Sequence, residues 1–412
     1  MLACLALGQM KTLYDRAATD DLDSLTTIVS MAFGGETDGV REWVRDKVTL
    51  ENVRVMRDQA GSAIACAALL PMGQYYGGRS VTMMGIAGVG VLPHWRAKGV
   101  GKAMMTEVVK ESEARNCAIS SLYPSTTALY RTVGYEQAGQ HFEHSYPVTR
   151  LPFKSGETGY RVRPMVAADL AAVRACYAKS CATCDGALDR SMYMWERKQN
   201  PRGKPAVGYV VIRQNPQTNG HCIDGYVYLR QDRPSGLGRH DLEVGDFSAT
   251  TPGAASELLS FLAGFSSMAE RVIYRAGASH PLATLLAESR YCEVAFRDTW
   301  MLRILNVERA FGERGYPRGL SIKLTFSVVD SLLPASNTSF TLTVNDGGGS
   351  VTRGGVPSPN ITADIRGLSQ LYCGQFSPVV LSHLGRITVK DSDSAALAAA
   401  VFSSNGGYCD FF

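Results

Sequence analysis

The 412-residue chain is poor in charge and contains no long apolar or basic run. Charged residues make up 19% of the sequence, the formal net charge is only +4, and basic residues are not interleaved with aromatic ones. Nucleic-acid binding therefore has little support. No stretch of about 18 uncharged apolar residues is present, which predicts no membrane span. With 45% hydrophobic residues, the sequence predicts a globular protein of two to four domains.

The first residues lack the basic segment and the apolar core that a secretory signal requires. We therefore expect a cytoplasmic location. Met10-Lys-Thr-Leu forms an alternative start to Met1, so residues 1–9 are expected to be a ragged extension.

Metal-ligand spacings are also scarce. Cys181-x-x-Cys184 has no second pair, which disfavours zinc and favours structural thiols. His141 and His144 lie three apart in a strand-like run, which places them on opposite faces. We expect both histidines at the surface and predict no metal site. The absence of Gly-x-Ser-x-Gly disfavours serine-hydrolase chemistry.

The chain divides into three parts, expected at residues 1–150, 151–304 and 305–412. The first two show mixed α/β patterns, and the third shows alternating strands followed by short helices. Predicted elements are helices over 20–33, 40–48 and following Gly101, strands over 53–57, 62–70, 80–91 and 119–123, a helical turn over 128–132, then strands over 208–212, 225–229 and 242–247 and a helix over 254–269. The fold class is therefore α/β (α+β).

A basic, glycine-bearing turn joins a β-branched strand to an amphipathic helix. The strand contains Val89 and Val91, and Gly90 between them predicts a bulge that would splay the strand edge. The turn reads Arg96-Ala-Lys98-Gly99-Val100-Gly101. Glycines let backbone N–H groups approach an anion, and the helix start adds unpaired donors and a positive dipole end. The turn therefore predicts a pyrophosphate grip, although an ordinary solvated turn has the same pattern.

A tyrosine motif follows about thirty residues later. Ser125-Thr-Thr-Ala-Leu-Tyr130 continues to Gly134-Tyr135, giving Tyr-x-x-x-Gly-Tyr. A lone tyrosine in an apolar run is more often a core residue. At this spacing from the glycine turn, however, the chain resembles the GCN5-related N-acetyltransferases, in which such a tyrosine protonates the departing CoA sulfur. The second part has a comparable strand, turn and helix, but its turn over 248–253 has no basic residue.

The order of the three parts resembles the enhanced intracellular survival (Eis) family of N-acetyltransferases. That resemblance implies tandem acetyltransferase folds, the second degenerate, and a sterol-carrier-like third domain. It implies an acetyl-CoA site at Val89, Val91, Arg96, Lys98, Gly99, Val100, Gly101 and Ser125, with Tyr130 as the general acid. It also implies a homohexamer. Trp95 stands where some relatives have a second basic residue.

In that family the general base is the carboxylate of a terminal phenylalanine that threads into the first domain. This chain ends in Asp410-Phe411-Phe412, so Phe412 is expected to be that base, and two terminal aromatics argue against a frayed end. The family's acceptor pocket is acidic, and Glu36, Asp38 and Asp410 are the candidate substrate-binding residues.

The expected reaction is acetylation of a primary amine on a polycationic small molecule such as an aminoglycoside. A protein lysine or a polyamine remains an alternative acceptor. A lipid carrier is the alternative of a different class, because sterol-carrier-like domains hold lipids.

Overall fold

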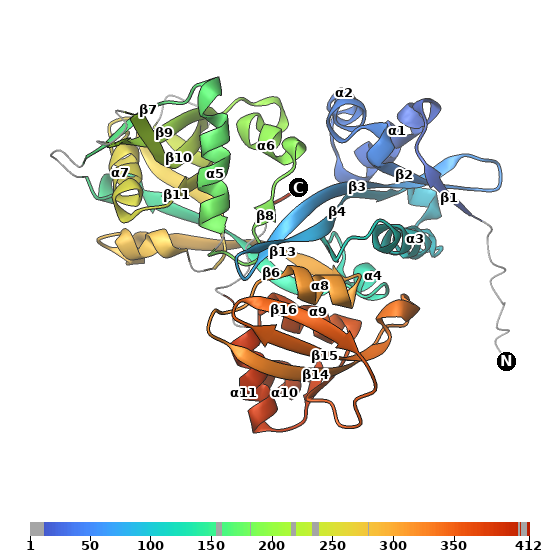
Figure 1. Cartoon of the computed structure of the whole chain (residues 1–412). Helices are drawn as coiled ribbons and strands as arrows, with labels where there is room; N and C mark the ends of the chain where they lie inside the picture. Colours follow the sequence, from blue (N-terminus) through green and yellow to red (C-terminus); the bar gives the residue numbers. More distant parts are fainter. Residues whose placement is uncertain are drawn as a thin grey trace.

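A continuous sheet of thirteen strands runs through the first two parts of the chain, and a five-stranded sheet forms the third (Figure 1). The computed structural model describes residues 12–153, 159–181, 183–215, 220–232, 239–278, 280–402, 404 and 410–412. The three parts are called the first, second and third units below. The mixed α/β class predicted from the sequence is confirmed.

The first unit surrounds the long hairpin of β3 and β4, which turns at Gly77 and Gly78, both with positive φ as a tight turn requires. Its apolar strands are buried between helices α1 and α3, on opposite faces of the sheet. Its elements are β1 (Leu13–Arg16), α1 (Leu22–Phe33), α2 (Thr37–Glu42) running into a π-helical turn (Trp43–Val48), β2 (Val53–Arg57), β3 (Ala63–Tyr76), β4 (Arg79–Val91), α3 (Val100–Ala114), β5 (Ile119–Leu122), α4 (Thr127–Arg131) and β6 (Glu136–Pro147).

The second unit repeats this plan, with α5 and α7 packed against its strands (Figure 1). Its elements are β7 (Tyr160–Pro164), α5 (Leu170–Cys181), β8 (Leu188–Asp189), α6 (Met192–Gln199), β9 (Val207–Asn215), β10 (Gly220–Asp232), β11 (His240–Ala249), α7 (Pro252–Ala263), β12 (Ala269–Ala276) and β13 (Glu293–Ile304). The helix predicted over 254–269 is wrong at its end. It stops before Gly264, and the next strand begins at Ala269.

The two units exchange strands. β13 lies between β5 and β6, so a strand of the second unit completes the sheet of the first. β6 in turn pairs with β12 of the second unit. β6 therefore lies in the interior of the sheet instead of at its edge, and His141 and His144 are only 5% and 1% exposed. The surface position predicted for them is therefore wrong.

The third unit packs its helices α8 and α9 against the first unit (Figure 1). Its sheet has the order β16-β15-β14-β17-β18. Five aromatic rings fill its interior, those of Phe311, Phe326, Phe340, Tyr372 and Phe402. Its elements are α8 (Val307–Glu313), β14 (Ser321–Val329), β15 (Thr338–Asn345), β16 (Gly348–Arg353), β17 (Ile361–Asp364), α9 (Ile365–Cys373), α10 (Pro378–His383), β18 (Ile387–Val389) and α11 (Ser392–Val401).

Within the ranges that the structure describes, none of the helices has the length and apolar character needed to cross a membrane.

Candidate active site

The end of β4 separates from its neighbour β5. The two parallel strands pair only from Met83 to Ile86, and β4 continues as far as Val91. Residues 87–91 of β4 therefore form a strand edge that does not pair with β5 in the described structure. Val89 and Val91, both half-buried, lie on this edge. Parallel strands that diverge in this way leave room for a ligand at their carboxyl ends.

The bulge that shapes this edge lies at Gly88, not at Gly90 as predicted. Ala68 of β3 pairs with Ala87, and Cys66 pairs with Gly90, so two residues of β4 oppose one residue of β3. Gly88 has φ of +57°, the left-handed conformation of a bulge glycine. Gly90 is required for packing, because a side chain there would meet Ile28 of α1.

The turn after β4 carries the predicted basic residues at the surface. The Arg96 Nε donates to the Val91 carbonyl oxygen at 3.1 Å, and Nη2 lies 3.5 Å from the Met31 carbonyl oxygen. The Lys98 ammonium lies 5.3 Å from the centre of the Trp95 ring. Both cations are exposed. They are thus anchored to the protein on one side and open to an anion on the other.

The start of α3 is shaped for close approach of a charged ligand. Gly99 caps the helix with φ of +81°, and space is open where a side chain would project. Val100 is the first helical residue and is buried, and Gly101 follows it. The free N–H groups of this first turn and the helix dipole attract anions. The turn therefore fits a pyrophosphate.

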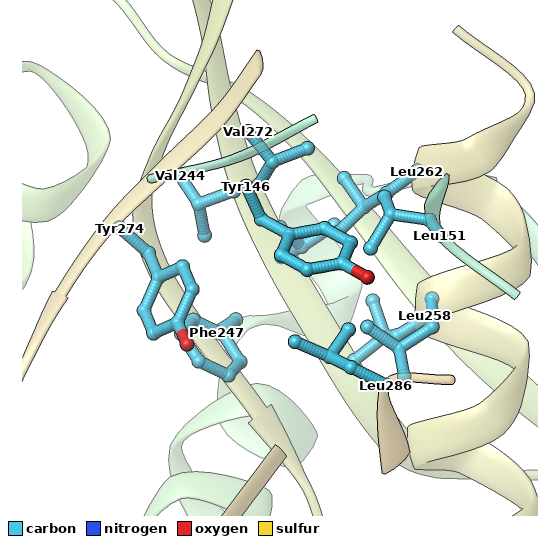
Figure 2. A pocket seen from close by; sticks show the side chains of 11 residues that line it. Tyr146, Leu151, Val244, Phe247, Leu258, Leu262, Val272, Tyr274 and Leu286 are labelled. Atoms are coloured by element: carbon cyan, nitrogen blue, oxygen red, sulfur yellow. The ribbon is translucent and has the colours of Figure 1, made fainter. Parts of the chain in front are cut away.

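The second unit has the same strands, but apolar side chains line the corresponding space among its described residues. β11 and β12 are parallel and pair as far as Val244 with Tyr274, yet the space beyond them is an apolar hollow under α7 (Figure 2). At the helix start, the hydroxyls of Tyr160 and Thr251 lie 3.0 Å apart, and the Tyr160 ring covers Gly253. A protein side chain thus covers the start of α7, which supports the prediction that this unit kept the fold and lost the phosphate grip.

Tyr130 lies in α4 and is 3% exposed. Burial raises the pKa of its phenol to about 12, against the opposing effect of a hydrogen bond with Ser125. The group therefore holds its proton at neutral pH, as a general acid must. Gly134 of the same motif has φ of +92°, and the buried Arg303 guanidinium lies where a side chain would project. Only glycine fits there.

The chain terminus lies inside the first unit. Phe412 is 6% exposed, and a methyl group on Gly85 of β4 would lie 3.0 Å from its Cε2. The Tyr123 ring, directly after β5, lies 4.7 Å from the Phe411 ring and 6.1 Å from the Phe412 ring. The terminus therefore lies at the divergence of β4 and β5. Tyr123, which contacts it, is close in sequence to Ser125 and Tyr130.

The three predicted acceptor-binding carboxylates have different environments. Glu36 and Asp38 are exposed at the start of α2. Asp410 is 2% exposed and forms ion pairs with Arg190 and Lys198 at 2.8 and 2.7 Å. A buried, neutralised carboxylate does not attract a polycation from solvent, so the substrate-binding role predicted for Asp410 is wrong.

Sequence reasoning missed several residues around the terminus. Tyr123 and Gly85 contact it, and Arg197 lies 5.6 Å above the Phe411 ring. None belongs to a local motif. A glycine in the middle of a long apolar strand was the one available signal, since it marks a close approach.

Comparisons with known proteins agree with this arrangement. Acetyltransferase (GNAT) domain models match residues 14–138 and 186–304, and a sterol carrier protein domain model matches residues 307–410. N-acetyltransferase Eis of Mycobacterium tuberculosis is 26% identical over 382 residues, which is 88% of this chain and 89% of the relative. The chain is an N-acetyltransferase of the Eis and GNAT type. The chain is also 25% identical to an uncharacterised N-acetyltransferase of Streptomyces avermitilis, over 80% of this chain and 81% of the relative.

Solved structures share the whole architecture of this chain. A GCN5-related N-acetyltransferase from Anabaena variabilis is 28% identical with a TM-score of 0.88, and the match covers 98% of this chain and all of that one. One from Kribbella flavida is 26% identical with a TM-score of 0.84, covering 98% and 99%. GNAT domains use acetyl-CoA as co-substrate, and the open turn at Gly99 beside two exposed cations suits its pyrophosphate.

Proposed function

We propose that this enzyme transfers the acetyl group of acetyl-CoA directly to a primary amine, with the Phe412 carboxylate as general base and Tyr130 as general acid. The observation that carries the proposal is the burial of Phe412 against Gly85, at the divergence of β4 and β5. Chain termini are usually frayed. A terminal ring held against Gly85 at this sheet edge supports the proposal that the terminal carboxylate serves as the base.

The roles of the remaining residues follow from their positions. Arg96, Lys98 and the first turn of α3, through Gly99, Val100 and Gly101, would hold the pyrophosphate of acetyl-CoA. Backbone N–H groups near Val89 and Val91, outside the β5 ladder, would bind the pantetheine amides and polarise the thioester carbonyl. Ser125 would fix the Tyr130 hydroxyl through the hydrogen bond between them.

The reaction then has three proton-balanced steps. The Phe412 carboxylate accepts a proton from the substrate ammonium, directly or through a water, and the freed amine attacks the thioester carbonyl carbon. The Phe412 carboxyl group releases this proton to solvent. The tetrahedral intermediate loses the second proton of its nitrogen to solvent and expels the CoA thiolate as the carbonyl re-forms. Tyr130 donates its proton to that sulfur and regains one from solvent. The products are an acetamide and CoA thiol, with one proton released.

The proposed acceptor is a polycationic small molecule such as an aminoglycoside. Exposed Glu36 and Asp38 at the start of α2 support attraction of a cation, and the family resemblance supports this acceptor class. A polyamine and a protein lysine are the competing acceptors. The lipid-carrier role is disfavoured, because aromatic rings fill the interior of the third unit. We also propose that the protein is a homohexamer, which sedimentation velocity tests, and that it is located in the cytoplasm.

The test is release of free thiol from acetyl-CoA by protein without a C-terminal tag. Acceptors are an aminoglycoside panel, spermidine and a lysine peptide, and a variant lacking Phe412 is assayed beside the full chain. We expect aminoglycoside-dependent release that falls at least about 100-fold in the deletion. Release with spermidine or the lysine peptide alone would reassign the acceptor, and equal release by the deletion would move the base elsewhere.

A further inference from the structure

The last three residues of the chain cross from one unit to another. Asp410 is buried among side chains of the second unit, whereas Phe412 is buried against the first. Two extended residues span at most about 7 Å. The location of Asp410 therefore limits where the Phe412 carboxylate can lie.

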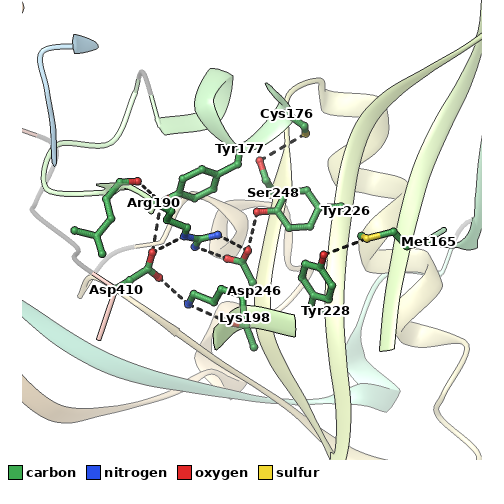
Figure 3. A network of polar contacts seen from close by, with 12 residues as sticks. Met165, Cys176, Tyr177, Arg190, Lys198, Tyr226, Tyr228, Asp246, Ser248 and Asp410 are labelled. Atoms are coloured by element: carbon green, nitrogen blue, oxygen red, sulfur yellow. Dashed lines mark hydrogen bonds and ion pairs between the residues drawn. The ribbon is translucent and has the colours of Figure 1, made fainter. Parts of the chain in front are cut away.

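Both carboxylate oxygens of Asp410 are engaged by cations (Figure 3). Oδ2 accepts from the Arg190 Nε at 2.8 Å, and Oδ1 lies 2.7 Å from the Lys198 Nζ. The Tyr177 hydroxyl lies 3.4 Å from Oδ2. Burial alone would raise the pKa of Asp410, but the charges of Arg190 and Lys198 outweigh it and hold the pKa well below its ordinary value.

Arg190 is itself fixed before it meets the tail. Its two terminal nitrogens donate to both oxygens of Asp246 at 2.6 and 2.8 Å, the bidentate geometry that holds a guanidinium most firmly. Tyr226 also donates to Asp246 at 2.7 Å, and the Tyr177 ring lies 3.8 Å from the guanidinium carbon. The receptor for Asp410 is thus prepared by β11, β10 and α5 of the second unit.

The charges of this cluster balance only when the tail is present. Arg190 and Lys198 carry two positive charges and Asp246 carries one negative charge, so without Asp410 the positive charge of the partly buried Lys198 is left uncompensated. An unpaired buried charge is strongly unfavourable. The cluster therefore favours the docked tail in addition to the apolar contacts of the two phenylalanines.

We propose that Asp410, Arg190 and Lys198 form a tail clamp, through which the second unit positions the Phe412 carboxylate in the active site of the first. Asp410 is a positioning residue, since it reaches the reaction only through Phe412. The proposal rests on the proposed function of Phe412 as base. It gives the unit that lacks the phosphate turn a part in positioning the proposed base.

The test measures release of Phe412 by carboxypeptidase A, which removes C-terminal aromatic residues, with intact mass spectrometry as the readout. Full-length wild type, Asp410→Asn and Lys198→Met are compared. We expect release to accelerate at least about tenfold in Asp410→Asn and by a smaller factor in Lys198→Met, because Arg190 remains. Lys198 lies at the edge of the cluster, so this variant preserves the test if Asp410→Asn does not fold.

Asp169→Asn is the matched control. Asp169 is a buried carboxylate of the same unit and pairs with Arg163 at 2.7 Å. It lies directly before α5 and is not part of the Asp410 cluster. Its loss should lower stability without exposing Phe412. Acceleration in this control equal to that in Asp410→Asn would mean general loosening and would overturn the clamp.

Activity separates the clamp from the proposed base. If both the clamp and the role of Phe412 as base are correct, kcat falls more in Asp410→Asn than in Lys198→Met, in parallel with the rate of Phe412 release. The KM for acetyl-CoA stays within about twofold. Wild-type release rates in both clamp variants would overturn the clamp. Accelerated release with unchanged kcat in the intact variants would support the clamp as a tail anchor and contradict the role of Phe412 as base.

Discussion

The Phe412 ring packs on Gly85, and a methyl group at that glycine would lie 3.0 Å from the ring. The contact joins the last residue of the chain to the middle of β4. Pairing of β4 with β5 ends at Ile86, the residue after Gly85. Any side chain at residue 85 must therefore displace Met72, Phe412 or both.

Gly85→Val should lower kcat about tenfold, since overpacking of this kind costs about 1–3 kcal/mol and the terminus is the movable partner. The KM for acetyl-CoA should change little. Steady-state kinetics check this result. Gly312→Ala is the control, because Gly312 lies in α8 with open space around it. Equal kcat in wild type and Gly85→Val would mean that the ring contact is irrelevant to turnover.

Tyr130→Phe should lower kcat on the order of 100-fold with nearly unchanged acetyl-CoA affinity, because the phenol acts on the leaving sulfur in the transition state. Binding of acetyl-CoA by calorimetry and turnover by thiol release separate the two quantities. Comparable losses in both would make Tyr130 a packing residue.

Arg96→Ala should raise the KM for acetyl-CoA about tenfold and leave kcat within about threefold, because one charged phosphate contact is lost. The wild-type KM should also rise with salt, and the variant should respond less. Lys110→Ala, an exposed cation at the other end of α3, serves as the control. A lower melting temperature with an unchanged KM would reduce Arg96 to its contacts with Val91 and Met31.

His141 should make stability depend on pH below neutrality. Burial, with the charges of Arg275 and Lys198, lowers its pKa from 6.5 to about 4. The unfolded chain therefore binds a proton first as pH falls, so the folded state loses stability from about pH 7 down to about pH 4. The loss is about 2–3 kcal/mol at pH 4. The free energy of unfolding, measured with urea at each pH, should fall more steeply with decreasing pH in wild type than in His141→Phe over this window. Equal slopes against pH would contradict the prediction.

Local signals predicted the parts of the site that lie within one turn or helix. Gly99, Lys98 and Arg96 are neighbours in sequence, and their chemistry follows from the strand, the turn and the helix start. Tyr130 was singled out by its local spacing to Gly134, and its role as general acid came from the resemblance to the GCN5-related N-acetyltransferases. The docking of Phe412 was expected only from the family resemblance, and the structure agrees with it.

Apart from the end of the helix predicted over 254–269, the errors involve partners distant in sequence. Gly90 was taken for the bulge because its contact with Ile28 is a tertiary one, and the bulge lies instead at Gly88. His144 is buried in β6, which pairs with β12 of the second unit and places Tyr274 opposite His144. Asp410 was expected to meet solvent, and its partner Arg190 lies 220 residues away. No periodicity or motif encodes such pairs.

The central claim is that the free α-carboxylate of Phe412 accepts the substrate proton. The most direct measurement compares kcat of semisynthetic enzyme ending in a carboxylate with the same chain ending in a carboxamide. The amide keeps the ring that packs on Gly85 and removes only the charge. We predict a fall in kcat of at least about 100-fold, with acetyl-CoA affinity unchanged. Equal turnover by the two forms would contradict the claim and place the base on another residue.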